Sequence, residues 1–212
     1  PQSASILDLV QEYIFESNSI RFEGDGYSDA WRREAIKRGF TLPKHGPDAM
    51  DAWWKKENME LFERHEILTA NELQARFEVC GDRYLSQMDI ETSILKEMVF
   101  TQILPTVHAY QSSLLENLQK RKVLGLDAKG FEKSLIQEID TLNESLKKSL
   151  TKLQKEEDVL DSLKTSQEKT HHYADRIRPL LLEIRESVDH LEGLLPDDHW
   201  PLPKYREMLF VR

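Results

Sequence analysis

One long run without a helix breaker constrains the fold of this chain more than any other feature. From Phe131 to Arg178 there is neither glycine nor proline, over 48 residues. As one straight helix this run would be about 70 Å long, at 1.5 Å per residue. Glycine and proline are scarce throughout, with 8 of each in 212 residues, and a sheet-rich fold would need more turns. We therefore expect an all-α helical bundle.

Leucine and isoleucine recur inside this run at heptad spacing. One seam position holds Ile139, Leu146, Leu153 and Leu160, and the other holds Leu135, Leu142 and Leu163 but is interrupted by Ser149 and Glu156. A coiled-coil dimer keeps both positions apolar over several heptads. We therefore favour a helical hairpin, residues 127–195, over a long parallel dimer. Its turn falls near 155–158, where charges crowd together, or near 164–167, where Thr165 and Glu168 have capping-box spacing.

Periodic apolar residues and boundary signals predict helices before the hairpin. The first is expected over 5–17 and the second over 29–38, with Ser28 as N-cap and Gly39 as its stop. A third should begin at Pro47, because a missing N–H is harmless at a helix start, and end near Asn58.

A capping box at Thr69 and Glu72 opens the next helical segment, and a further long helix is expected over 90–123, kinked at Pro105. The apolar positions that follow the capping box are Leu73, Phe77, Cys80, Tyr84 and Leu85.

The hairpin and the C-terminal end carry their own boundary signals. Asp127 is a candidate N-cap, Pro179 should kink the last helix, and Gly193 and Pro196 should end it. The tail from Trp200 to Phe210 is too apolar for a solvated end. We expect it to dock on its own bundle or on another domain.

Charge and cysteine content exclude several classes of protein. Lys and Arg number 29 and Asp and Glu 38, a net charge of −9, which argues against nucleic-acid binding through phosphate neutralisation. One cysteine permits no internal disulfide, which suits the cytoplasm. Residues 98–115 carry no charge, but seven polar side chains interrupt them, so we read a buried helix and not a membrane span.

Two histidine patterns have part of the spacing of a metal site, but neither is complete. Glu168 and His171 have the Glu-x-x-His spacing of di-metal bundles, which need that motif twice, and none of the other histidines has a glutamate three residues earlier. His65-Glu66 begins a zinc-protease motif, but position 69 is Thr. The adjacent His171 and His172 are read as a surface pair.

Three further motifs have structural readings that outweigh functional ones. Gly24-Asp25-Gly26 lacks the residues of a nucleotide-binding loop and indicates a turn. Cys80 lies on an apolar helical stripe, which predicts burial. Trp53-Trp54 should place one ring in the core and the other against a neighbouring domain. The sequence therefore predicts no catalytic, cofactor-binding or metal-binding residue.

Four segments in order resemble the region after the catalytic barrel of type III glutamine synthetases. They are Ile20-Arg-Phe-Glu-Gly-Asp-Gly-Tyr-Ser-Asp-Ala-Trp31 with Glu34-Ala-Ile-Lys-Arg-Gly39, Glu72-Leu-Gln-Ala-Arg76 with Tyr84 and Ile90-Glu91, Ile103-Leu-Pro105 with Ala109-Tyr110, and Trp200-Pro-Leu-Pro203 with Tyr205 and Met208-Leu-Phe210. Residues 1–5 and the charged hairpin resemble the family poorly.

The resemblance implies a C-terminal fragment of a longer enzyme that ligates ammonia to glutamate with ATP. Residues 1–40 would follow the catalytic barrel and 41–212 would form a helical domain. ATP and Mg²⁺ or Mn²⁺ would bind the barrel, so this fragment alone is expected to be inactive and to need no cofactor. A start at Pro1 in place of Met suits such a fragment.

The resemblance also implies partners and a structural role. The domain would support a double-ring homo-oligomer. We expect Trp31, Trp53, Trp54 and the 200–210 tail to pack the domain together or to pack it onto the catalytic barrel of the same chain. The alternatives are a free-standing helical interaction module and a small complete enzyme.

Overall fold

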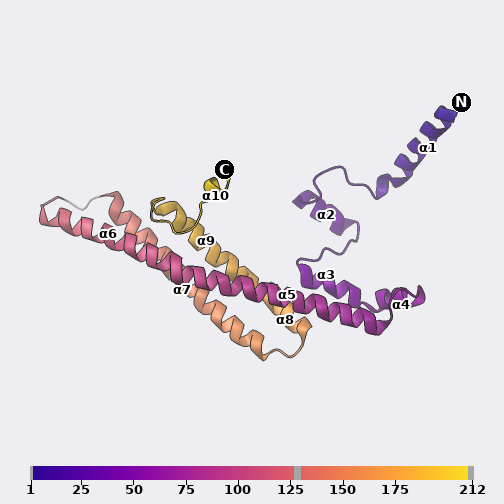
Figure 1. Ribbon diagram of the computed structural model, residues 1–212. Helices are drawn as coiled ribbons and strands as arrows, with labels where there is room; N and C mark the ends of the chain where they lie inside the picture. The colour runs from indigo at the N-terminus through magenta and orange to yellow at the C-terminus, as the bar shows by residue number, and fades with distance from the viewer. Residues whose placement is uncertain (1, 127–129, 210–212) are drawn as a thin grey trace. The chain divides into compact units, whose positions relative to one another are not determined.

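The computed structural model describes residues 2–126 and 130–209, and every regular element within them is a helix (Figure 1). The prediction of an all-α fold is confirmed. The chain divides into two compact units, which we call the N-terminal unit (Pro1–Lys44) and the bundle unit (His45–Arg212). Within the described residues, no helix combines the length and apolar content needed to cross a membrane.

The N-terminal unit holds α1 (Gln2–Glu16), a 3₁₀ turn η1 (Ser17–Ser19) and α2 (Asp29–Lys37). As predicted, Ser28 caps α2, its hydroxyl accepting the Trp31 N–H at 3.2 Å. Gly39 ends the helix with φ +82°, a conformation that costs a residue with Cβ.

A small aromatic cluster and one arginine hold the N-terminal unit together. The Trp31 ring lies 4.8 Å from Phe22 and 6.2 Å from Phe40 between centroids. Arg38 Nε donates to Glu34 at 2.8 Å, which holds the pKa of that carboxyl below its ordinary value. Arg38 Nη1 also donates to the carbonyls of Ser19 and Arg21, both at 3.1 Å. Arg38 therefore ties the loop before α2 to the end of that helix.

The bundle unit begins with three short elements where one helix over 47–58 was predicted. These are α3 (Gly46–Asp51), the 3₁₀ turn η2 (Ala52–Trp54) and α4 (Lys56–Arg64). The predicted extent of this helix was wrong, because Lys55 has an extended backbone with ψ 135° that breaks the helix. Across the break, the Asn58 side chain donates a hydrogen bond to the Ala52 carbonyl. The break lets Trp54 stack on Phe77, with centroids 5.3 Å apart.

A single helical rod follows, from residue 70 to 123. It consists of α5 (Ala70–Met98), a π-helical turn η3 (Val99–Ile103) and α6 (Leu104–Val123). The capping box predicted at its start is present, with the Glu72 carboxylate accepting the Thr69 N–H at 2.8 Å. The two helices expected here, one opened by the capping box and one over 90–123, are thus continuous with each other.

The hairpin has its turn at the second of the two positions considered. α7 (Phe131–Ser162) is followed by α8 (Ser166–His172), a π-helical turn η4 (Tyr173–Ile177) and α9 (Arg178–Leu194). Thr165 and Glu168 form the predicted capping box, and α9 packs back against α7. Asp127 lies outside the described residues.

Helix α7 packs against α6 of the rod and against α9 of the hairpin (Figure 1). Rod and hairpin share one hydrophobic core. Its buried residues come from the rod (Val99, Ile103, Val107, Leu114), from α7 (Leu135, Ile136, Ile139, Leu146, Leu153), from η4 and α9 (Tyr173, Ile177, Leu180, Ile184, Leu191) and from the end of the hairpin (Leu195, Trp200). Ser149 interrupts the α7 seam but is itself buried, and its hydroxyl donates to Glu183 on α9 at 3.0 Å.

The C-terminal tail docks on the bundle through its first residues. Trp200 is buried in the shared core, and Leu202 packs against it. The Lys204 ammonium donates to the Glu192 carbonyl at 3.3 Å and to Asp197 at 2.6 Å. The short helix α10 (Tyr205–Met208) follows, with Met208 exposed, and Phe210 lies outside the described residues.

Candidate functional site

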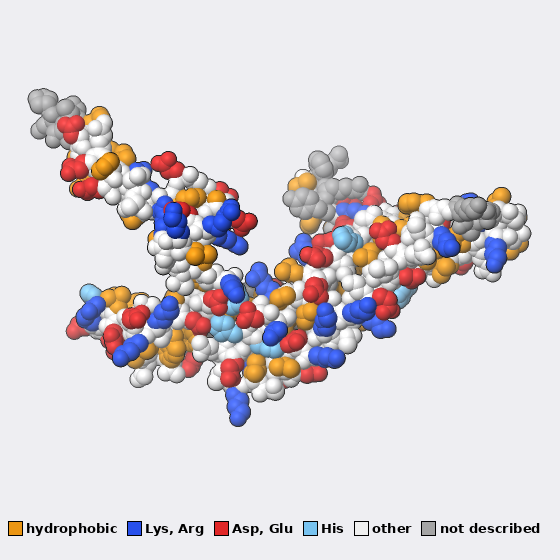
Figure 2. Space-filling model, turned by 180° about the vertical axis from the view of Figure 1, so that it is seen from behind, with side chains coloured by type: hydrophobic (Ala, Val, Ile, Leu, Met, Phe, Trp, Pro, Cys, Tyr) orange, Lys and Arg blue, Asp and Glu red, His pale blue; other side chains and the backbone are white. Residues whose placement is uncertain are grey.

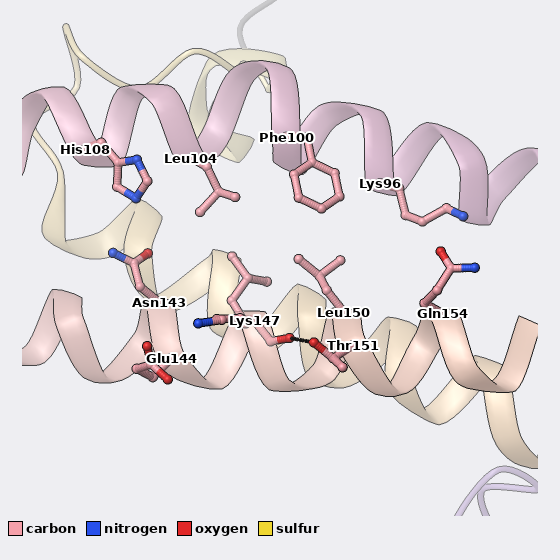
Figure 3. Close-up of a pocket in the computed structure, with 11 residues that line it drawn as sticks. Lys96, Phe100, Leu104, His108, Asn143, Glu144, Lys147, Leu150, Thr151 and Gln154 are labelled. Carbon is pink, nitrogen blue, oxygen red and sulfur yellow. Dashed lines mark hydrogen bonds between the residues drawn. The ribbon is translucent and has the colours of Figure 1, made fainter.

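A groove runs between the rod and α7, with a volume of about 560 Å³ (Figure 3). Lys96, Phe100, Leu104 and His108 line one wall at steps of four along the rod, and Asn143, Lys147, Leu150 and Gln154 line the other. Figure 3 shows Phe100, Leu104 and His108 pointing across the gap, towards the wall from which Asn143 and Leu150 point back. The Phe100 ring is 56% exposed, so the groove opens to solvent.

Polar groups mark both ends of this groove. At one end the Lys96 ammonium bonds both oxygens of Glu157, at 2.7 and 2.9 Å. At the other, the buried Oδ1 of Asn143 has no hydrogen-bond partner among the described residues. An unpaired buried acceptor costs free energy, so a hydrogen-bond donor placed beside Asn143 would be favoured.

Histidines and aspartates gather where α3 meets α8 and η4. His45 Nε2 lies 3.1 Å from Asp175 Oδ1, and His171 Nε2 lies 2.7 Å from Asp51 Oδ2. The two imidazole rings stand edge to face, with centroids 5.7 Å apart. We call His45, Asp48, Asp51, His171 and Asp175 the histidine–aspartate cluster.

Each cluster residue has a local reason for its position. His45 is the N-cap of α3, where its Nδ1 accepts the Asp48 N–H at 3.3 Å. Asp48 and Asp51 are three residues apart on α3, and His171 and Asp175 are four apart across α8 and η4. These spacings place each pair on one helix face. The His45 side chain is only 8% exposed and that of His171 28%.

A second polar network lies inside the core, between the rod and η4. The Tyr173 hydroxyl contacts Thr92 Oγ1 and lies 2.7 Å from the Met88 carbonyl. Thr92 Oγ1 is itself 2.8 Å from that carbonyl. Tyr173 is 2% exposed and Thr92 fully buried. Burial raises the pKa of Tyr173 to about 12, so the hydroxyl stays protonated and serves to position the two helices.

The Glu168-x-x-His171 pair does not share a site. The Thr165 N–H is hydrogen-bonded to Glu168 at 3.1 Å, which lowers the pKa of that carboxyl, while His171 turns to Asp51. Reading His171 and His172 as a surface pair was wrong. Both are partly buried, and His172 Nε2 lies 3.2 Å from the Glu156 carboxylate.

The predicted burial of Cys80 was also wrong, since this cysteine is exposed. Phe77 and Tyr84, on the same apolar stripe of α5, are partly buried, whereas the Cys80 side chain faces solvent. Gly24-Asp25-Gly26 forms the predicted turn, closed by the Asp25 side chain, which accepts the Tyr27 N–H at 2.9 Å. Trp53 is 47% exposed, in line with one inward and one outward ring.

The histidine–aspartate cluster escaped sequence reasoning because its two histidines lie 126 positions apart. One local signal was the four-residue spacing of His171 and Asp175, which places both side chains on one helix face. The third member, His45, joins them only because the hairpin folds onto α3.

Comparison with known proteins shows the family of this chain. Residues 5–122, more than half of the chain, match the glutamine synthetase C-terminal domain family. The chain is 34% identical to a glutamine synthetase of Bacteroides fragilis over 98% of its length, and 29% identical to one of Butyrivibrio fibrisolvens over 97%. It is 27% identical to a type-3 glutamine synthetase of Dictyostelium discoideum over 96%. The chain spans only 28–29% of these relatives. On the family match, this chain belongs to the glutamine synthetase C-terminal domain family.

Proposed function

We propose that this chain serves as the non-catalytic C-terminal helical domain of a type III glutamine synthetase, and that it stabilises the assembled enzyme. The observation that carries the proposal is the match along nearly the whole chain to enzymes more than three times as long. A domain that accounts for less than a third of such an enzyme leaves most of its length for the catalytic machinery.

The chemistry of the whole enzyme would lie outside this domain. Ligation of ammonia to glutamate consumes ATP, and Mg²⁺ or Mn²⁺ would bind with the nucleotide at the catalytic barrel. The domain's own part is to hold that barrel and its neighbours in a cytoplasmic homo-oligomer with a double ring.

The exposed apolar face of α1 supports a role in assembly. Seven large side chains of this helix are between 47% and 84% exposed: Ile6, Leu7, Leu9, Val10, Tyr13, Ile14 and Phe15. A helix that is apolar over so wide a face is normally buried, and contiguous exposed apolar surface marks an interaction site. Packing of α1 against the catalytic body would bury this apolar face.

Charge substitutions on α1 of the full-length enzyme test the proposal. Leu9→Asp and Tyr13→Asp each place a carboxylate in the apolar face and should lower the assembled mass in mass photometry, with a parallel loss of glutamine formation. Gln11→Asp adds the same charge at a polar position of the same helix and should leave both measurements unchanged.

Two results would contradict the proposal. One is an assembled mass and activity unaffected by both apolar substitutions. The other is ATP-, Mg²⁺- and glutamate-dependent glutamine formation by residues 1–212 alone, which would make the domain itself catalytic.

A further inference from the structure

The histidine–aspartate cluster has the donor set of a transition-metal site. We propose that His45, His171 and Asp175 bind a divalent ion of the Zn²⁺ class, and that the ion fastens α3 to the α8–η4 arm of the hairpin. Two imidazoles with one carboxylate suit Zn²⁺ better than Mg²⁺ or Ca²⁺, which prefer oxygen ligands throughout. Three protein ligands leave a fourth position for water.

The distances fit such an ion after a small movement. One ligand atom from each of the three residues lies within 4.8 Å of the other two, and His45 Nε2 and Asp175 Oδ1 are already 3.1 Å apart. Zn–N and Zn–O bonds of about 2.0–2.2 Å place tetrahedral ligands roughly 3.3 Å from one another. His171 must therefore move by roughly 1–1.5 Å, and its partly exposed side chain has the freedom to do so.

The remaining two aspartates lie where a metal site needs supporting acceptors. Metal-bound histidines usually donate their other ring N–H to a carboxylate, which fixes the tautomer. Asp51 Oδ2 lies 2.7 Å from His171 Nε2, which leaves Nδ1 of that ring for the ion. Asp48 Oδ1 lies 3.7 Å from His45 Nδ1. Metal binding at Nε2 would move the ring proton to Nδ1, which would exchange the bond accepted from the Asp48 N–H for one donated towards the Asp48 carboxylate.

Charge and burial also favour a cation here. Three carboxylates face two imidazoles, and the His45 side chain is more than nine-tenths buried. A divalent ion would offset the carboxylate charge in a place that water reaches poorly. His45 lies more than 120 positions from His171 and Asp175 in the chain. The ion would therefore join the start of the bundle unit to its hairpin and stabilise the folded state by mass action.

Zinc binding to the full-length protein tests the proposal. After chelator treatment, titration with ZnSO₄ should load one more ion per chain on the wild type than on His171→Ala or His45→Ala. Asp51→Asn should weaken the same binding by about 10–100-fold, as supporting acceptors do. His190→Ala is the matched control, since this histidine is exposed on α9 and its loss should change neither stoichiometry nor affinity. Counting ions relative to the variants separates this site from metals bound elsewhere in the protein.

Co²⁺ in place of Zn²⁺ adds a spectroscopic readout. The wild type should show visible absorption bands of four-coordinate Co²⁺ that are missing from His171→Ala. Asp175→Asn keeps the shape of a side chain that is 57% exposed, so it should fold, lose the bands, and lose the rise in thermal midpoint that Zn²⁺ gives the wild type. Equal zinc stoichiometry and equal cobalt spectra in the wild type and folded Asp175→Asn and His171→Ala variants would overturn the proposal.

Discussion

The buried hydroxyl of Tyr173 allows a prediction whose sign changes with pH. Tyr173, Thr92 and the Met88 carbonyl make three close contacts, but the two hydroxyls carry only two protons. One hydroxyl must donate to the carbonyl and the other to its neighbouring hydroxyl. In Tyr173→Phe the Thr92 hydroxyl still donates to Met88, so no buried group is left unpaired. At pH 7 the variant should lose one net hydrogen bond, about 1 kcal/mol of unfolding free energy.

Alkaline pH should reverse this difference. Burial raises the pKa of Tyr173 to about 12, the hydrogen bond with Thr92 opposes the rise, and the carboxylates of Asp89 and Glu157 add to it. An unfolded tyrosine ionises with a pKa near 10. The contribution of Tyr173 to the unfolding free energy of the wild type is thus present in full below pH 10 and falls as the pH rises towards 12. At pH 11 the fall is about 1.4 kcal/mol. Phenylalanine has no such loss, so the two proteins should be equally stable at a pH between 10 and 11, and at pH 11 the variant should be the more stable by about 0.4 kcal/mol.

Urea unfolding followed by far-UV circular dichroism, at pH 7, 10, 11 and 11.5, measures this crossing. All other alkaline titrations are shared by the two proteins and cancel in their difference. Tyr27→Phe, at a ring that is 94% exposed, should show no change in its difference from wild type over the range. A Tyr173→Phe variant that stays less stable by a constant margin from pH 7 to 11.5 would refute the argument.

Three further predictions follow from single positions. Thr165→Ala removes the cap at the hairpin turn and should cost about 1 kcal/mol in urea unfolding, whereas Thr151→Ala, exposed in the middle of α7, should change stability by less than about 0.5 kcal/mol. Ile177→Ala, fully buried in η4, should cost about 2–5 kcal/mol, and Leu182→Ala, 54% exposed on α9, far less. Cys80 is exposed and should react with Ellman's reagent in the folded protein as completely as in urea.

Features set by neighbouring residues were predictable from the sequence. The capping boxes at Thr69 and Thr165, the cap at Ser28 and the stop at Gly39 each depend on a few adjacent residues, and all four are present. The fold class followed from the long run without glycine or proline. The position of the hairpin turn remained open because the crowded charges near 155–158 tolerate a helix as well as a loop.

Features set by packing between distant segments were not predictable. Cys80 shares the helical spacing of the buried Leu73 and the partly buried Phe77 and Tyr84, but its own side chain is exposed. The histidine–aspartate cluster needs α3 to lie against α8, and nothing within either segment specifies that contact. Trp54 stacks on Phe77 because the extended Lys55 breaks the helix between the two tryptophans and α4.

Pro105 and Pro179 each lie in the first turn of a long helix, α6 and α9, directly behind a buried segment. A kink was expected at Pro105 and Pro179, because proline removes one backbone bond and crowds the preceding turn. The structure places a π-helical turn directly before each, where Leu104 N–H bonds Val99 O and Arg178 N–H bonds Tyr173 O, five residues back. The wider turn gives the proline ring room, while the residues at both ends of each π turn stay buried in the core. Proline therefore interrupts the hydrogen-bond ladder at these positions without interrupting the buried face of the helix.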